Sequence, residues 1–223
     1  LIDAKIRAEF TVDVHSGLHK YTFHGQNQKK YILLDLDYRD ELLSADFETI
    51  AKNKIKGHRI SKAWAEEQHF YFYLESNIDW KKAKQITKNG RHKLLLEFPK
   101  DTKELMLRVG ISAVDTEGAE KNLKAEIVGF DFVAQRVKAN HAWENELSKI
   151  HFDADKNTKT IFYTALYHSF LAPNTFSDVD GRYRGMDKQF HQLEDKNDKH
   201  FTVFSLWDTF RATHPLFTLT QEE

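Results

Sequence analysis

Apolar and polar residues alternate with a period of two through most of the first 115 residues, as in strands that have one buried face. Residues 6–14 show this alternation clearly, and so do residues 105–114, where every second side chain from Leu105 to Ala113 is expected to lie on one face of the strand. The alternation also predicts strands at residues 18–23, 31–36, 47–51, 57–63, 68–75 and 92–98. Many short strands separated by turn signals are typical of stacked antiparallel sheets, so the sequence predicts a β-sandwich.

The spacing of the apolar residues changes from that of a strand to that of a helix after residue 114. Residues 115–125 are expected to form a short helix, with Asp115 placed to cap its free backbone N–H groups. Residues 131–150 carry the apolar stripe of a longer helix, on which Trp143 is expected to pack into a core. Strands followed by helices indicate two domains, which are expected to meet near Gly129.

Two further helices are predicted in the last third of the chain. Residues 158–171 have apolar side chains at helical spacing, and Pro173 follows the predicted end. Another helix is expected to begin at Ser205, because Ser205 and Asp208 have the spacing of a capping box. The predicted fold class is therefore mixed, with β-structure first and helices after it.

Composition places the chain among globular proteins and argues against one class of partner. Hydrophobic residues make up 40% of the 223 positions and charged residues 30%, as expected for a domain with a buried core. Lys and Arg number 33 against 34 Asp and Glu, a net charge of −1. A protein that binds nucleic acid usually has a basic excess or stripe, and none is present. The lysine-rich segments at residues 52–56 and 81–84 are predicted to be solvated turns.

The absence of some residue types and patterns excludes several kinds of chemistry. The sequence contains no cysteine, which excludes disulfides, thiolate catalysis and cysteine-based zinc sites. No apolar run reaches the roughly 18 residues of a membrane span, and no signal peptide is visible. The 12 histidines lack helical metal-ligand spacing, which favours structural or surface roles. Because Leu1 stands where an initiator Met is usual, we expect a mature or trimmed fragment.

The most polar segment of the chain lies at residues 177–187, where Asp178, Asp180, Arg182 and Arg184 occur within seven positions. It is too polar to form a core and is suited to line a polar cavity. A calcium loop of the EF-hand type is not indicated, because the arginines would neutralise the carboxylates and the closing Glu is missing. Two interpretations remain: a rigid, salt-bridged loop at a domain junction, or side chains that contact a ligand directly.

Trp207 and Asp208 follow this segment and point more sharply to carbohydrate. An indole can stack on the apolar face of a pyranose, and an adjacent carboxylate can accept hydrogen bonds from two neighbouring hydroxyls. The same Asp208 also suits the first turn of a helix, where a carboxylate interacts favourably with the helix dipole. The residues alone leave both interpretations open.

Aromatic residues in the first half could also stack on sugars. The run at residues 70–73 is more typical of a sandwich strand with one row of rings inside and one outside. Trp64 fits either a sugar-facing position or the core. No nucleophile elbow or phosphate-binding loop is present.

Several long motifs resemble those of one enzyme family, glycoside hydrolase family 92, the calcium-dependent exo-acting α-mannosidases. The resemblance extends over nearly the whole chain, which makes it specific. It rests on residues 162–168 (FYTALYH), 172–174 (APN), 176–187 (FSDVDGRYRGMD) and 202–211 (TVFSLWDTFR) with His214-Pro215, and on residues 17–23 (GLHKYTF), Trp64-Ala65 with Gln68, and 109–119 (VGISAVDTEGA).

The resemblance implies an architecture and a reaction. Residues 1–128 are expected to form the antiparallel β-sandwich with its short helix, 129–152 a linker helix, and 153–223 the first helices of an (α/α)6 barrel. The family inverts the anomeric carbon, which needs a general acid and a general base about 6.5–9.5 Å apart. Calcium assists by engaging mannose hydroxyls. By the family pattern, the catalytic carboxylates and the calcium ligands are expected to lie outside this chain.

The resemblance also assigns roles to residues of this chain. Trp207 and Asp208 are expected in the pocket for the terminal mannose, and Asp178, Asp180, Arg182 and Arg184 are expected to support that pocket; the list contains no catalytic residue and no metal ligand. The implied substrate is a glycan with terminal α-linked mannose, α-1,2 linkages included. The implied location is secreted, periplasmic or at the cell surface.

Expectations about partners and alternatives complete the sequence interpretation. This segment alone is expected to be inactive, and the remainder of the same enzyme, present as a separate chain, is one expected partner. One alternative is a non-catalytic carbohydrate-binding or interaction module built on the β-sandwich. Another is a sugar phosphorylase, since such enzymes combine a sandwich with an (α/α)6 barrel.

Overall fold

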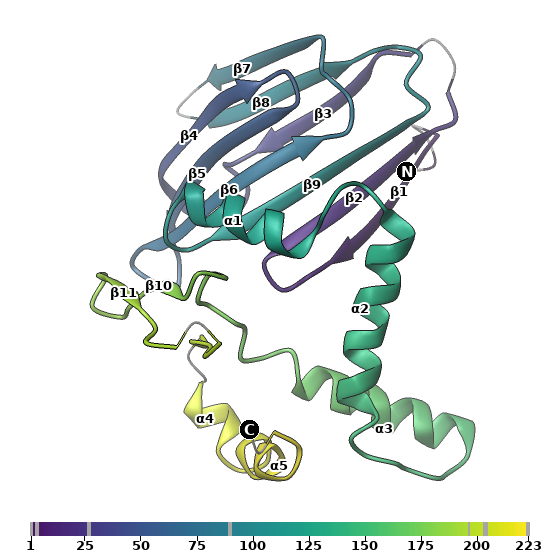
Figure 1. The fold of residues 1–223 in the computed structure, drawn as a ribbon, viewed down its shortest axis with the longest axis vertical. Helices are drawn as coiled ribbons and strands as arrows, with labels where there is room; N and C mark the ends of the chain where they lie inside the picture. The colour runs from purple at the N-terminus through teal and green to yellow at the C-terminus, as the bar shows by residue number, and fades with distance from the viewer. Residues whose placement is uncertain are drawn as a thin grey trace.

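The computed structural model describes residues 2, 5–25, 28–88, 91–195, 197–202 and 205–221. Two antiparallel sheets stack on each other, and a helical segment follows them along the chain (Figure 1). The larger sheet has the strand order β1-β2-β9-β6-β5-β4, and the smaller has the order β3-β8-β7. The strands are β1 (Ile6–Val12), β2 (Ser16–Phe23), β3 (Lys30–Asp35), β4 (Glu41–Ala51), β5 (Lys54–Lys62), β6 (Gln68–Ser76), β7 (Lys82–Lys88), β8 (Arg91–Phe98) and β9 (Glu104–Ser112). The predicted β-sandwich is confirmed.

The main core lies between the two sheets, as the alternating pattern predicts. Leu96 and Phe98 of β8 pack with Phe72 of β6 and with Leu105 and Leu107 of β9, and all five are almost fully buried. Each such side chain removes enough apolar surface from water to stabilise the fold by about 1.5–3 kcal/mol. This core therefore holds the two sheets together.

A second core lies on the opposite face of the larger sheet, beneath helix α1 (Thr116–Glu126). Ala119 and Leu123 of α1 are fully buried there against Leu18 and Tyr73 of the sheet. A β-carbon on Gly110 would lie 2.2 Å from the backbone oxygen of Ala119, so the close approach of α1 to β9 requires glycine at that position.

The alternation in β9 describes one face of the strand: Leu105 and Leu107 are buried in the main core, and Ile111, farther along the same face, is 36% exposed. One expectation for the strands is wrong. The lysine-rich residues 81–84 are not simply a turn, because they lead into β7, an edge strand in which the side chains of residues 82–86 are exposed. Exposed lysines suit a sheet edge since they discourage pairing with other chains. Similarly, Lys54 begins β5.

The helices confirm most of the predicted boundaries. Asp115, Asp131 and Asp155 cap the first three helices by accepting hydrogen bonds from backbone N–H groups of the first turn. The helix expected to begin at Ser205 begins at Leu206, with Ser205 in the N-cap position, and a second short helix follows it. Ser205 makes no side-chain cap hydrogen bond, and its hydroxyl instead donates to Asp208. After α1 come α2 (Phe132–Leu147), α3 (Lys156–Ser169), α4 (Leu206–Thr209) and α5 (Thr213–Thr220).

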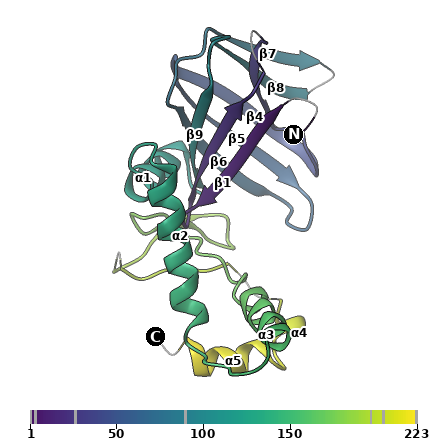
Figure 2. The same cartoon turned by 90° about the vertical axis from the view of Figure 1, so that its right-hand side faces the viewer.

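Helix α2 leads away from the sandwich, and α3, α4 and α5 gather beyond its far end (Figure 2). Trp143 of α2 contacts Tyr167 of α3 with ring centroids 4.5 Å apart, and Phe170 contacts Phe217 of α5 at 5.9 Å. Trp143 is only partly buried by these contacts. Within the described residues, no helix has both the length and the apolar character needed to cross a membrane.

Candidate functional site

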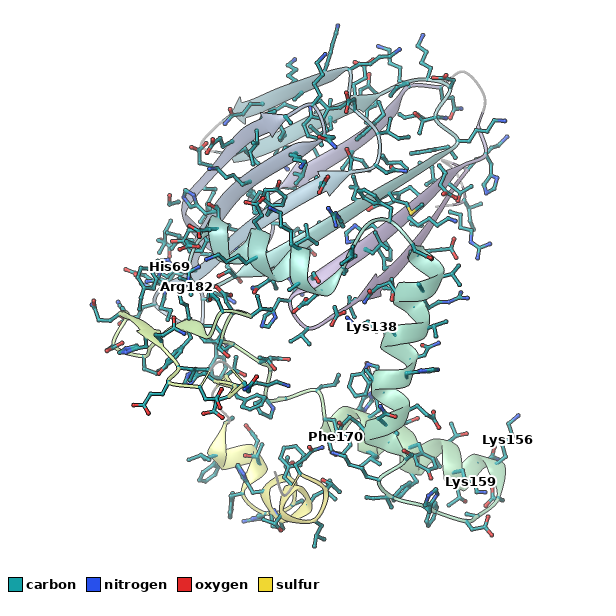
Figure 3. All side chains as sticks on the ribbon, in the orientation of Figure 1. His69, Lys138, Lys156, Lys159, Phe170 and Arg182 are labelled. Carbon is teal, nitrogen blue, oxygen red and sulfur yellow. The ribbon has the colours of Figure 1, made fainter. Side chains whose placement is uncertain are left out.

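The polar segment at residues 177–187 runs through a tight turn into a hairpin of β10 (Arg182–Arg184) and β11 (Phe190–Gln192). The turn closes with a hydrogen bond of 2.8 Å from Gly181 N–H to the backbone oxygen of Asp178. Gly181 has a φ of +82°, a conformation that favours glycine. The hairpin lies below the sandwich, with Arg182 on the side that faces the sheet and α1 (Figure 3).

Asp178 is buried inside the protein, with 4% of its surface exposed. Its carboxylate accepts a hydrogen bond of 2.7 Å from the Ser112 hydroxyl and one of 2.8 Å from the Asn122 amide. Burial raises the pKa of Asp178 above its usual value, although these two hydrogen bonds oppose the rise. A side chain on Gly118 would collide with the carboxylate, since a β-carbon there would lie 2.2 Å from Oδ2. Asp178 therefore attaches the segment to β9 and α1.

Asp180 and Arg182 form ion pairs with the start of α1. The Arg182 guanidinium donates to Asp115 at 2.7 and 3.3 Å and to Asp180 at 3.0 Å. Lys121 of α1 donates to the same oxygen of Asp180, Oδ2, at 3.1 Å. Burial alone would raise the pKa of Asp180, but the hydrogen bonds from Lys121 and Arg182 outweigh it and lower the pKa. The charges of Asp180 and Arg182 therefore neutralise each other at the surface of α1.

Arg184 extends the attachment to the end of β9. Its Nε donates to the backbone oxygen of Ala113 at 3.1 Å, and its Nη1 donates to that of Lys188 at 3.3 Å. The guanidinium also lies 4.5 Å from the centroid of the Phe190 ring, within the range of a cation–π interaction. Like the three other charged side chains, Arg184 is engaged by the protein, as in a rigid salt-bridged loop. A role in supporting a sugar pocket stays a prediction.

Trp207 and Asp208 lie on a different element, the short helix α4. Trp207 is 87% exposed, so its indole face is open to a ligand. The exposed carboxylate of Asp208 accepts a hydrogen bond of 2.6 Å from the Ser205 hydroxyl. Asp208 also occupies the first turn of α4, which agrees with the interpretation that its carboxylate interacts with the helix dipole. A role in sugar binding stays a prediction for this pair.

Calcium ligands are not evident in the part of the chain that the structure describes. No group of three or more His, Asp or Glu side chains there is arranged to hold a metal ion. The carboxylates of residues 177–187 already accept hydrogen bonds from protein donors: Asp178 from Ser112, Asp180 from Lys121, and Asp187 from the Gln189 backbone. These residues do not fit a calcium site.

The structure shows two further residues at this site, Asn122 and Asp115, to which the sequence analysis assigned no role in it. Asn122 is fully buried on α1 and contacts Asp178, and Asp115 binds Arg182 in addition to capping α1. The sequence does contain a pattern that could have identified Asn122. It is a polar residue between Ala119 and Leu123, on the face of the predicted helix that packs against the sheet. Trp64, which the sequence left undecided, is fully exposed between β5 and β6 and is not part of the core.

Two family domains match the chain over nearly its whole length. Residues 1–112 match the glycosyl hydrolase family 92 N-terminal domain, and residues 118–223 match the family 92 catalytic domain. The chain belongs to glycosyl hydrolase family 92. The boundary between the two matches, at residues 113–117, falls at the start of α1, the helix on which the polar segment is anchored. None of the curated proteins matches the chain.

Solved family 92 structures share the fold. The α-mannosidase BT3965 from Bacteroides thetaiotaomicron is 32% identical, with a TM-score of 0.88 over 97% of this chain and 32% of that chain. Its complex with mannoimidazole gives a TM-score of 0.87. The inverting mannosidase BT2199 from Bacteroides thetaiotaomicron VPI-5482, at 21% identity and a TM-score of 0.83, shows the same fold. This chain spans about a third of the length of these enzymes, and its β-sandwich and following helices correspond to their N-terminal sandwich and the start of their helical barrel.

Proposed function

We propose that this family 92 chain functions in an exo-acting α-mannosidase that hydrolyses terminal α-linked mannose from glycans. One observation carries the proposal: a solved α-mannosidase that binds mannoimidazole is 32% identical and superposes on 97% of this chain. The match of residues 118–223 to the family's catalytic domain supports it further.

Within this function, we assign Trp207 and Asp208 to the pocket for the terminal mannose. The exposed indole of Trp207 offers a flat surface for the apolar face of the sugar ring. Asp208 can accept hydrogen bonds from two adjacent hydroxyls while Ser205 holds its Oδ2. The rigid segment that carries Asp178, Asp180, Arg182 and Arg184 then supports the pocket from the side of the sandwich.

The finer features of the reaction are also proposals. We propose inversion of the anomeric carbon, α-1,2-linked mannose among the substrates, and calcium as the metal that engages the sugar. Inversion requires two carboxyl groups about 6.5–9.5 Å apart, with room for a water between them. We assign the acid, the base and the calcium ligands to the two thirds of family 92 enzymes that this chain does not span. Substrates of this kind suit a secreted, periplasmic or cell-surface protein.

The proposal is tested with the protein as its gene encodes it, assayed on a panel of aryl glycosides. We expect turnover of the aryl α-mannoside and none of the aryl β-mannoside or α-glucoside. Turnover that requires phosphate would instead show a phosphorylase. Binding of mannose without any hydrolysis would indicate a carbohydrate-binding module. Either result, or hydrolysis of other aryl glycosides but not of the aryl α-mannoside, would contradict the proposed function.

A further inference from the structure

A polar side chain is fully buried at the point where three parts of the chain meet. Asn122 lies on the inner face of α1, and its amide nitrogen donates hydrogen bonds of 2.8 Å to the backbone oxygen of Ile111 and to Asp178. Its amide oxygen accepts a hydrogen bond of 2.9 Å from the backbone N–H of Val179. Both hydrogens of the amide nitrogen and the amide oxygen therefore take part in hydrogen bonds. The three bonds join α1 to Ile111 of β9, to Asp178 and to Val179.

These contacts leave the backbone at residues 178–179 little freedom. The carboxylate of Asp178 is fixed on one side by Asn122 and on the other by Ser112 of β9. A fully satisfied buried polar network specifies one arrangement, because any other would leave polar atoms unpaired away from water. The side chain of Asn122 thereby fixes the position of Asp178 relative to the sandwich.

A ladder of backbone hydrogen bonds continues from Asp178 toward α4. The backbone N–H groups of Phe176 and Ser177 donate to the oxygen of His200 at 2.7 and 3.1 Å. Thr202 N–H donates to the oxygen of Asn174 at 2.8 Å, and the Ser177 hydroxyl accepts from His200 N–H at 3.0 Å. Residues 174–177 and 200–202 are therefore paired, and only three residues separate Thr202 from the first residue of α4.

We propose that Asn122 is a positioning residue for Trp207 and Asp208. It holds Asp178 on the sandwich, Asp178 fixes residues 174–177, and these pair with residues 200–202, which three residues of the chain separate from α4. The inference rests on the proposed function, because that function places Trp207 and Asp208 in the sugar pocket. Asn122 lies on the sandwich side of the junction and does not touch the sugar; it acts only through this connection.

The test compares two variants of α1 in the protein as its gene encodes it. Asn122→Ala removes all three hydrogen bonds, whereas the control Leu123→Ala removes an adjacent, fully buried side chain that packs α1 on the sheet. We expect Asn122→Ala to lower kcat/KM on an aryl α-mannoside at least about tenfold, since small displacements of binding groups have large effects on rate. At temperatures where both variants are folded, we expect Leu123→Ala to retain wild-type kcat/KM.

Amide hydrogen exchange reports the connection without relying on activity. Asn122→Ala is expected to increase exchange in residues 174–178, 200–202 and 206–209, and Leu123→Ala to increase it mainly in α1. If the protein hydrolyses no mannoside, the proposed function fails, while the exchange pattern still tests whether Asn122 positions α4. Wild-type kcat/KM and exchange in Asn122→Ala, or the same losses in both variants, would overturn the proposal.

A second variant guards against a simple loss of folding. Asn122→Asp keeps the shape of the side chain but places a second carboxylate against Asp178. As the pH falls, one of the two carboxyl groups takes up a proton, the repulsion ends, and a hydrogen bond between them can form. The ratio of kcat/KM for Asn122→Asp to that of the wild type should therefore rise between about pH 8 and about pH 5. A ratio that does not change with pH would contradict the positioning role.

Discussion

Replacement of Gly118 by alanine tests the junction between the polar segment and α1. Alanine is the better helix former, and at an unobstructed helical position the change stabilises a protein by about 0.5–1 kcal/mol. At Gly118, however, the new β-carbon would lie 2.2 Å from Oδ2 of Asp178 and 2.8 Å from Oγ of Ser112. The carboxylate must move by about 1 Å to reach ordinary contact distance, and the 2.7 Å hydrogen bond from Ser112 is then broken.

The expected effect follows from these two opposing contributions. A buried hydrogen bond to a charged group contributes about 1.5–3 kcal/mol, which exceeds the gain in helix propensity. We therefore expect Gly118→Ala to lower the free energy of unfolding by about 1–2 kcal/mol, or Tm by about 2–8 °C, in thermal unfolding followed by circular dichroism.

The variant Asp178→Ala supplies the control, because it removes the group that Gly118→Ala displaces. In that background, Gly118→Ala should be neutral or should raise Tm, so the sign of its effect should reverse. A higher Tm for Gly118→Ala in the wild-type background, or an equal loss of Tm in both backgrounds, would show that the β-carbon does not displace the Asp178 carboxylate.

Three further predictions concern the ion pairs of Arg182 and the proposed sugar contacts. Asp208→Ala should lower kcat/KM on an aryl α-mannoside at least about tenfold, and its Tm should match that of the wild type because the side chain is exposed; wild-type turnover would contradict this. Trp207→Ala should weaken binding of mannoimidazole in calorimetry with no loss of Tm, since the indole is 87% exposed, and unchanged affinity would exclude Trp207 from the pocket. Arg182→Met should lower Tm near neutral pH, because it removes the partner of Asp115 and Asp180. The interactions of these two carboxylates lower their pKa, so the stability that they contribute is lost when they are protonated. The difference in Tm between the wild type and Arg182→Met should therefore shrink as the pH falls below the ordinary aspartate pKa of 3.8. A difference in Tm that stays constant with pH would show that these ion pairs do not contribute to stability.

The strands could be predicted from the sequence because burial of one face leaves a period of two along the chain. Leu105 and Leu107 follow that rule, and both are buried between the sheets. The second core could not be predicted in the same way, since Tyr73 is buried on the opposite face by α1. Alternation shows which side chains share a face of a strand, but it does not show that a helix later in the chain covers the other face.

Local rules succeeded at the helix starts and failed where longer-range contacts decide the structure. Asp115 caps α1 as predicted, because a cap depends on a few consecutive residues. Ser205 has the spacing of a cap, yet its hydroxyl bonds to Asp208 and α4 ends after one turn. The partners Asn122 and Asp178 are 56 positions apart, and no local pattern connects them. The motifs show the family, whereas the network that anchors the polar segment is visible only in three dimensions.

The proposed mannosidase activity is tested by incubating the protein, as its gene encodes it, with a glycan that ends in α-1,2-linked mannose. The products are followed by mass spectrometry with phosphate present and absent. We expect release of free mannose, one residue at a time from the non-reducing end, at a rate independent of phosphate. Release of mannose 1-phosphate, release of larger fragments, or no release from any terminal α-mannoside would contradict it.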